Sequence, residues 1–260
     1  MASSALVALE EDYRRVSLPL LALAPRVKGM STWVRGSSAA FTNDPGERFA
    51  VGVFLYAEGE LVWGGEERGV AHGDLVDLRV PEATVESDPG VLFIYATKQV
   101  YLDGEPVPRK RFEETWVFLA SEERGSLAVS IPAVPYIGSL KPVIDNHYLC
   151  FPGVRMVRGV WSSTAYVINP YPDQISMRCW LQATDGKTGD VPAASAIPPK
   201  SVRAVELPQS FDGSITGNPE RFDYGTLVVW CNLKPQGFVA IRDGSGRTRA
   251  MDHFHPFWRS

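Results

Sequence analysis

Two closely spaced histidines near the C-terminal end have the clearest capacity for chemistry in this sequence. His253 and His255 are separated by one residue, so in an extended segment both imidazoles would lie on the same side of the backbone. With His147 as a third ligand, they would form a nitrogen-rich site of the kind that binds transition metals. One hypothesis is therefore a metal-dependent or cyclase-like β-barrel enzyme that uses histidines of the second half of the chain.

The same histidines also fit a structural role. A duplicated barrel of the cupin type carries its His-x-His pair early in the barrel, followed by a glutamate and a further histidine, and no such residues follow His253. Phe254, Phe257 and Trp258 surround the pair, which is typical of an aromatic C-terminal strand or arm. We therefore expect no cofactor and keep the metal site as an alternative.

Two short motifs resemble catalytic loops, but each lacks a required feature. Gly186-Lys187-Thr188 matches the end of a phosphate-binding loop, yet Leu181 occupies the position at which that loop needs a glycine. Asp243-Gly244-Ser245-Gly246 does not satisfy the nucleophile-elbow pattern, and no helical pattern follows it. Both motifs lie between strand-like segments, so we predict that both are hairpin turns. The sequence therefore favours a protein that is not an enzyme.

Aromatic residues outside the most regular strand patterns are the remaining functional signal. Exposed aromatic side chains in loops on a rigid β scaffold usually mark a contact surface, for a protein or for a stacked ligand such as a sugar. Trp161, Tyr166 and Tyr171 are the candidate stacking platform. The whole predicted contact or ligand surface comprises Trp161, Tyr166, Tyr171, Tyr148, Phe254, Phe257 and Trp258. An equally good interpretation is that these side chains cover the junction between two domains.

Composition and charge narrow the classes of partner. The formal charge is −4 and no concentrated run of lysine and arginine occurs, so we expect no nucleic acid as partner. No segment approaches the ~20 apolar residues that span a bilayer, and the acidic residues after Leu9 do not suit a signal peptide. Three cysteines without paired spacing favour a reducing compartment. We expect a cytoplasmic protein or a component of an assembled particle, without a membrane partner.

Alternating apolar residues predict many short strands, and the strand patterns of the first half recur in the second. In Phe49–Leu55 and Ile175–Leu181, alternate positions form one apolar face, and the second segment follows the first at an offset of 126 residues. Three further pairs of segments repeat in the same order. They are Ser37–Asn43 with Ser163–Asn169 (offset 126), Asp74–Glu82 with Ser201–Gln209 (127) and Pro89–Ala96 with Tyr224–Cys231 (135). Arg15–Pro19 and Ala128–Pro132 form a fifth pair, at an offset of 113.

These repeats predict an all-β protein of tandem duplicated β-sandwich or jelly-roll-like units with little helix. The expected division is an N-terminal arm or short helix at 1–14, a first unit at 15–125 and a second unit at 126–260 that duplicates the first with loop insertions. If the N-terminal segment is helical, Ser3 or Ser4 would cap it. The alternative is one large sandwich whose halves look alike only through shared alternation.

The duplicated all-β scaffold and the aromatic termini favour a non-enzymatic structural or assembly protein that makes protein–protein contacts in a homo- or hetero-oligomer. Self-association is the expected interaction, and tandem jelly-roll units recur in viral shells, so a component of a viral or other particle is one form of this hypothesis. The second unit holds three of the four histidines and all three cysteines, so we place any unit-specific function there. A carbohydrate- or small-ligand-binding module and the histidine-based enzyme are the alternatives.

Overall fold

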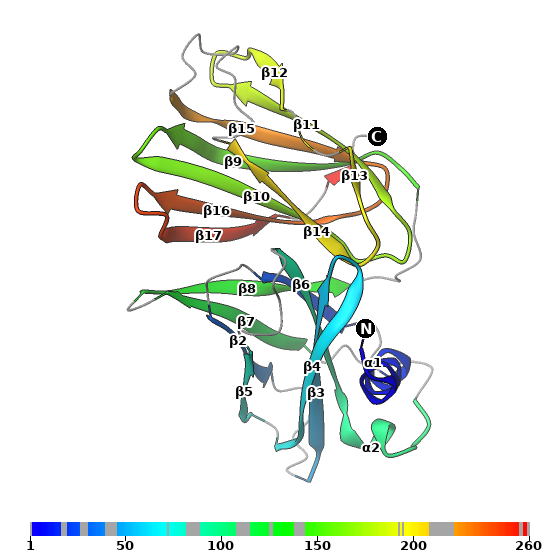
Figure 1. Ribbon diagram of the computed structural model, residues 1–260. Helices are drawn as coiled ribbons and strands as arrows, with labels where there is room; N and C mark the ends of the chain where they lie inside the picture. The colour runs from blue at the N-terminus through cyan, green and yellow to red at the C-terminus, as the bar shows by residue number, and fades with distance from the viewer. Residues whose placement is uncertain are drawn as a thin grey trace. The chain divides into compact units, whose positions relative to one another are not determined.

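The computed structural model describes most of the chain and divides it into two compact units, Met1–Ser139 and Leu140–Ser260. The residues described are 2–16, 20–26, 31–39, 46–71, 73–81, 89–107, 115–124, 127–137, 144–191, 193, 195–207, 221–254 and 257–258. Within them the protein is mostly β, as predicted, with antiparallel strands and two helices (Figure 1). No helix among these residues is long and apolar enough to cross a membrane.

The first unit contains both of the described helices and eight of the described strands. Their bounds are α1 (Ser4–Val16), β1 (Leu20–Arg26), β2 (Ser31–Ala39), β3 (Arg48–Ala57), β4 (Glu60–Ala71), β5 (Leu75–Val80), β6 (Gly90–Lys98), α2 (Gln99–Leu102), β7 (Thr115–Arg124) and β8 (Leu127–Ile137). The strands are hydrogen-bonded in the order β4-β3-β6-β1-β8-β7-β2-β5. Strand β8 joins two sheets, because it pairs with β1 on one side and with β7 on the other.

Helix α1 packs on β4 and β6 of the first unit, and α2 lies beside it (Figure 1). The N-terminus of α1 is capped as predicted, because the Ser3 hydroxyl accepts a hydrogen bond from the Leu6 backbone N–H (3.2 Å). Tyr13 is fully buried, and its ring meets Phe54 of β3 edge-on at a centroid distance of 5.8 Å. Glu10, also buried, accepts a hydrogen bond from the Tyr95 hydroxyl (2.7 Å). Apolar packing and a buried hydrogen bond together fix the helix to the sheet.

The second unit is built of strands throughout its described residues. Their bounds are β9 (His147–Val157), β10 (Trp161–Asn169), β11 (Ile175–Ala183), β12 (Thr188–Asp190), β13 (Ala196–Ile197), β14 (Ser201–Glu206), β15 (Arg221–Cys231), β16 (Gln236–Asp243), β17 (Thr248–Phe254) and β18 (Phe257–Trp258). The main order is β12-β11-β15-β9-β10-β16-β17, with β14 on β10, β13 on β11 and β18 on β9. The alternation predicted for β11 is confirmed, since Cys179 and Leu181 are buried while Arg178 and Gln182 are exposed.

Several strand pairs of the first unit have a counterpart in the second. The pairs β3·β6, β6·β1 and β2·β7 of the first unit correspond to β11·β15, β15·β9 and β10·β16 of the second. The register also agrees between the β3·β6 pair and the β11·β15 pair. Val53 of β3 pairs with Ile94 of β6, and Cys179 of β11 pairs with Val229 of β15. Cys179 follows Val53 by 126 residues and Val229 follows Ile94 by 135, which are the offsets predicted from sequence. Duplication as the origin of this likeness stays a prediction.

Two of the other repeat assignments cannot both hold. Leu75 and Val202 were matched at an offset of 127, and they pair with Ser37 and Ile168 respectively. The structural counterpart of Ser37 is then Ile168 and not Ser163, five residues away. The hydrogen-bond register therefore supports at most one of these two sequence matches.

The division between the units also differs from the expected boundary at residues 125–126. Ala128–Pro132, which the sequence comparison placed at the start of the second unit, lies inside β8. That strand pairs with β1 and β7, so it belongs to the first unit, which extends to Ser139. The counterpart of β1 in the second unit is β9, because both strands pair with the equivalent strands β6 and β15.

Candidate functional site

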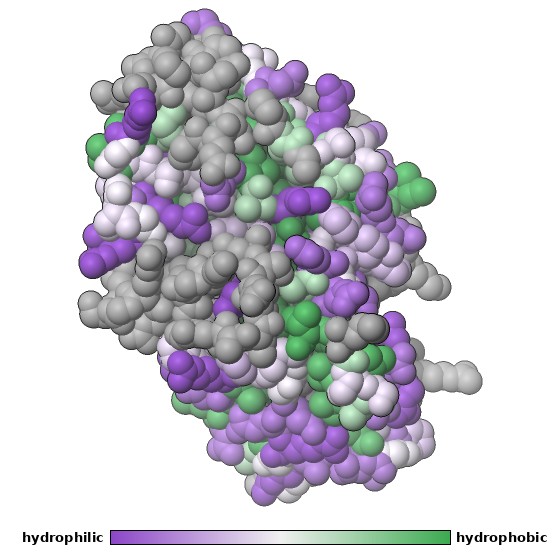
Figure 2. Space-filling model, viewed as in Figure 1, coloured by the Kyte–Doolittle hydropathy of each residue, from purple (hydrophilic) through white to green (hydrophobic). Residues whose placement is uncertain are grey.

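Exposed apolar side chains are sparse on the described surface. Figure 2 shows hydrophilic side chains between small hydrophobic patches over the described part of one face. The exposed large hydrophobic residues among those described are Val7, Leu75, Val100, Ile144 and Val160. Isolated residues of this kind are ordinary. Val160 differs because it also lines a depression in the second unit, next to a partly exposed tryptophan.

Two hairpin turns of the second unit form the walls of this depression. The β9–β10 turn is closed by the Val160 N–H and the Val157 carbonyl (2.8 Å), and Gly159 has a φ of +72°. The β16–β17 turn is closed by the Gly246 N–H and the Asp243 carbonyl (2.8 Å), and Gly246 has a φ of +76°. Positive φ is favourable mainly for glycine, so the sequence of each turn follows from its backbone. The turn predicted around Asp243 is confirmed.

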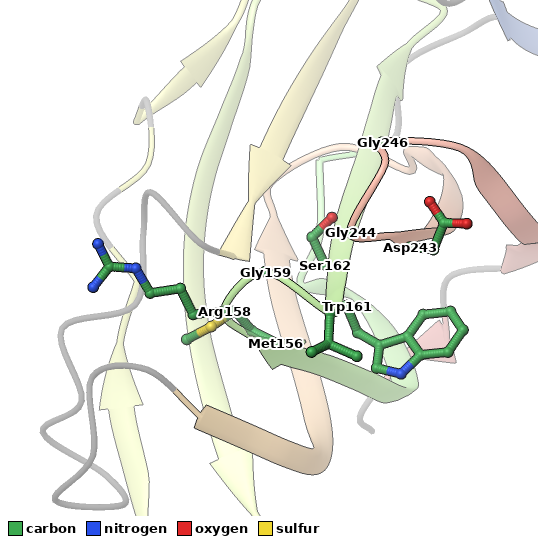
Figure 3. Close-up of a pocket in the computed structure, with 9 residues that line it drawn as sticks. Met156, Arg158, Gly159, Trp161, Ser162, Asp243, Gly244 and Gly246 are labelled. Atoms are coloured by element: carbon green, nitrogen blue, oxygen red, sulfur yellow. The ribbon is translucent and has the colours of Figure 1, made fainter.

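The tips of the two turns pack directly against each other. A Cβ atom added to Gly244 would lie 2.0 Å from the Gly159 carbonyl oxygen, so only glycine fits at that position. The depression beside this contact has a volume of about 490 Å³ (Figure 3). It is lined by Met156, Arg158, Gly159, Val160, Trp161, Ser162, Asp243, Gly244 and Gly246. We call residues 158–162 together with 243–247 the hairpin-tip surface.

Two apolar side chains of the hairpin-tip surface are open to solvent. Val160 is 50% exposed at a turn position where polar residues are usual, and Trp161 follows it at the start of β10 and is partly exposed. The Arg155 guanidinium lies over the Trp161 ring, 4.0 Å from the ring centroid, in a cation–π contact that holds the indole in place. In Figure 3, Trp161 and Arg158 extend in opposite directions from the turn.

The β16–β17 hairpin contributes a carboxylate that is fully engaged within its own turn. Asp243 Oδ1 accepts hydrogen bonds from the Ser245 hydroxyl (2.6 Å) and from the backbone N–H groups of Ser245 and Arg247 (2.9 and 3.1 Å). Its Oδ2 accepts a hydrogen bond from the Arg249 guanidinium (2.6 Å). The pKa of Asp243 lies well below its usual range. The hydrogen bond from the Ser245 hydroxyl contributes most to this shift, and the hydrogen bond from Arg249 also lowers the pKa. Asp243 therefore stays ionised at neutral pH and serves to build the turn.

Two members of the predicted stacking platform are not on the surface. Tyr166 and Tyr171 are each 2% exposed, whereas Trp161 is partly exposed. Tyr166 lies in β10, which is paired on both sides by β14 and β16, and its hydroxyl accepts a hydrogen bond from Arg242. Tyr171 lies in the turn after β10, where its N–H donates to the side-chain oxygen of Asn169 (2.9 Å). Both tyrosine rings belong to the core, so the platform predicted from sequence is wrong.

The other predicted aromatic contact residues lie on three strands of the second unit, β9, β17 and β18. Tyr148 of β9 is partly exposed and pairs in register with Phe257 of β18. Trp258 pairs with His147, so the backbone of the predicted C-terminal strand runs along β9. Phe254 ends β17. The side chains of Phe254, Phe257 and Trp258 lie outside the described part of the structure, and their role in contacts stays a prediction.

The predicted metal ligands lie on different strands or outside the described residues. His147 begins β9 and is 2% exposed. His253 pairs through its backbone with Phe238 of β16, and its side chain is not among the groups described. His255 lies outside the described residues. Across the described chain, no group of three histidine, cysteine or acidic side chains is placed to hold a metal ion. The metal site stays a prediction.

Four residues that shape the surface of the second unit escaped sequence reasoning. Val160 and Arg158 flank a glycine in a short turn, and an apolar residue in such a turn was the available signal. Trp180 and Trp230 lie in predicted strands and are not among the predicted contact residues. Both are partly exposed, and alternation along β11 would have placed Trp180 on the outward face, two residues after the exposed Arg178.

Comparisons with known proteins do not assign a family. No family model and no curated protein matches the chain. A structure of the serine-rich repeat protein Srr2 from Streptococcus agalactiae is similar at 9% identity, covering 91% of this chain and 79% of that one, with a TM-score of 0.24. A structure of infectious bursal disease virus, Gt strain, has 8% identity, coverages of 92% and 56%, and a TM-score of 0.17. Both TM-scores are too low to carry an argument about fold or function.

Proposed function

We propose that this protein is a non-enzymatic structural protein that assembles through contacts between copies of the chain. The observation that carries the proposal is the pair Val160 and Trp161, two apolar side chains that face solvent on a hairpin tip. Burial of apolar area drives association, and tryptophan and arginine are enriched at the centres of interfaces. The close contact between Gly244 and Gly159 holds the two tips together, so little order has to be imposed when a partner binds.

The hairpin-tip surface has the residues to be complementary to itself. A two-fold symmetric dimer places the same patch of both copies face to face, so every contact occurs twice. Arg158 and Trp161 extend in opposite directions from the β9–β10 turn (Figure 3). In a two-fold pair, Val160 and Trp161 of each copy would face the same two residues of the other, and their apolar area would be buried at the contact. Val160 would then be buried between the two turns.

The solution mass of the full chain, measured by light scattering over a range of concentrations, tests this proposal. We expect a defined oligomer whose mass falls toward that of the monomer in Val160→Asp, because the new carboxylate would be desolvated at the contact. Val100→Asp is the matched control, since Val100 in α2 is 40% exposed and Val160 is 50% exposed. A wild-type chain that stays monomeric at every concentration, or an equal loss of mass in both variants, would contradict the proposal.

A further inference from the structure

A second depression in the second unit has the composition of a small-ligand site. It has a volume of about 350 Å³, within the range of small-molecule sites, and is lined by Tyr148, Arg178, Trp180, Asp190 and Trp230. We call these five residues the aromatic notch. None of them belongs to the hairpin-tip surface, so a ligand at the notch does not depend on assembly through the hairpin tips.

Strand register brings the aromatic notch together on one face of the sheet. Trp230 of β15 pairs with Arg178 of β11 on one side and with Tyr148 of β9 on the other, so these three side chains share a face. Trp180 lies two residues after Arg178 and shares that face, and it pairs with Asp190 of β12. The intervening residues of β11 are buried, so packed side chains support the notch from behind.

The aromatic rings of the notch are held by contacts within the protein. The Trp230 indole N–H donates a hydrogen bond to the side-chain oxygen of Asn146 (2.8 Å). Tyr148 and Trp180 meet edge to face, with their ring centroids 6.3 Å apart and their planes at 79°. Because the two rings are nearly perpendicular, a small molecule can contact the Tyr148 and Trp180 rings from two directions. Because these rotamers are already fixed, stacking on them costs little side-chain entropy.

The polar groups of the notch are one cation and one anion, Arg178 and Asp190. Both residues are exposed, and neither side chain forms a hydrogen bond or ion pair within the part of the chain that the structure describes. The guanidinium offers five N–H donors in one plane, and the carboxylate offers acceptor positions on two oxygens. The notch therefore combines stacking surfaces with donors and acceptors that no described residue of the chain engages.

We propose that the aromatic notch binds a neutral sugar, as a hexopyranose or a short oligosaccharide. One face of a pyranose ring presents several C–H groups, which pack on the electron-rich face of an indole or phenol ring. Its hydroxyl groups both donate and accept hydrogen bonds, which suits a guanidinium and a carboxylate at the edges of the notch. The charges of Arg178 and Asp190 balance, so an anionic sugar attracted by the first would be repelled by the second.

Other classes of ligand fit the notch less well. Single-stranded nucleic acid stacks on aromatic residues but needs a positively charged groove for its backbone, whereas the notch has one arginine and one aspartate. A neutral sugar uses both the rings and the two charged groups.

Titration of the full-length protein with neutral oligosaccharides tests the proposal. The probes are linear oligosaccharides of glucose, mannose, galactose and N-acetylglucosamine, each up to about 10 mM so that millimolar affinity is detected, with tryptophan fluorescence and calorimetry as readouts. We expect at least one probe to bind. Trp180→Ala should weaken this binding by about tenfold or more through loss of stacking, and Asp190→Asn by about tenfold through loss of a charged acceptor. Trp180→Phe keeps an aromatic face and should retain most of the affinity.

Trp161→Ala is the matched control, because Trp161 belongs to the hairpin-tip surface. It should lower the solution mass and leave sugar binding unchanged, whereas Trp180→Ala should lower sugar binding and leave the mass unchanged. The two proposals can therefore fail separately. The sugar proposal is overturned if no neutral probe binds, or if Trp180→Ala and Asp190→Asn keep wild-type affinity.

Discussion

Replacement of Gly244 by alanine should separate the two hairpin tips of the second unit. An added Cβ would stand 2.0 Å from the Gly159 carbonyl oxygen and 2.8 Å from its carbon, whereas real Cβ atoms essentially never approach another heavy atom within 3.0 Å. The turns must therefore move apart by about 1 Å. Because the opposing atoms are backbone, no side chain can rotate away to make room.

The cost of Gly244→Ala can be worked out from this geometry. The clash can be relieved only if the whole β9–β10 turn is displaced. Overpacking of this kind lowers the free energy of unfolding by about 1–3 kcal/mol. For a domain of this size, that corresponds to a fall of about 3–12 °C in the melting temperature. The displaced turn carries Val160 and Trp161, so the oligomeric mass should fall as well.

Urea and thermal unfolding, followed by tryptophan fluorescence, measure the first effect, and light scattering measures the second. Gly186→Ala in the β11–β12 turn is the control, because its added Cβ would meet nothing within 4 Å and only the φ of +84° is strained. This control should lose about 1–2 kcal/mol but keep its mass. If Gly244→Ala matches the wild type in both stability and mass, the packing of the hairpin tips is wrong.

Two further predictions concern buried ionisable groups. Glu10→Ala should destabilise the first unit by about 1–3 kcal/mol, because the Tyr95 hydroxyl loses its acceptor, whereas exposed Glu11→Ala should cost less than about 0.5 kcal/mol. Equal costs in urea unfolding would refute the buried contact. Burial raises the pKa of Cys179 to about 12, so almost no thiolate exists near pH 8, and iodoacetamide should label the less buried Cys150 first. Equal labelling of the two thiols in the folded protein, detected by mass spectrometry, would contradict this burial.

Patterns within single segments were sufficient to predict local structure. Alternation of apolar and polar residues placed Cys179 inside β11 and Arg178 outside it, and the Gly/Asp-rich composition at Asp243 marked the β16–β17 turn. Ser3 or Ser4 was expected to cap the N-terminal helix, and Ser3 does so. These features depend on neighbours two to four residues apart, so the sequence contains all of the information that determines them.

Only the tertiary structure determined which aromatic side chains are exposed and which of them lie next to one another. Tyr166 is buried and lies in β10 between β14 and β16, and its own segment contains nothing that predicts those neighbours. Trp230 and Tyr148 lie far apart in the sequence and become neighbours only through the register of β15 on β9. Alternation assigns a side chain to one face of a strand. Whether that face is covered, and which residues stand beside it, depends on pairing between distant strands, because cross-strand hydrogen bonds carry no signal in the local pattern.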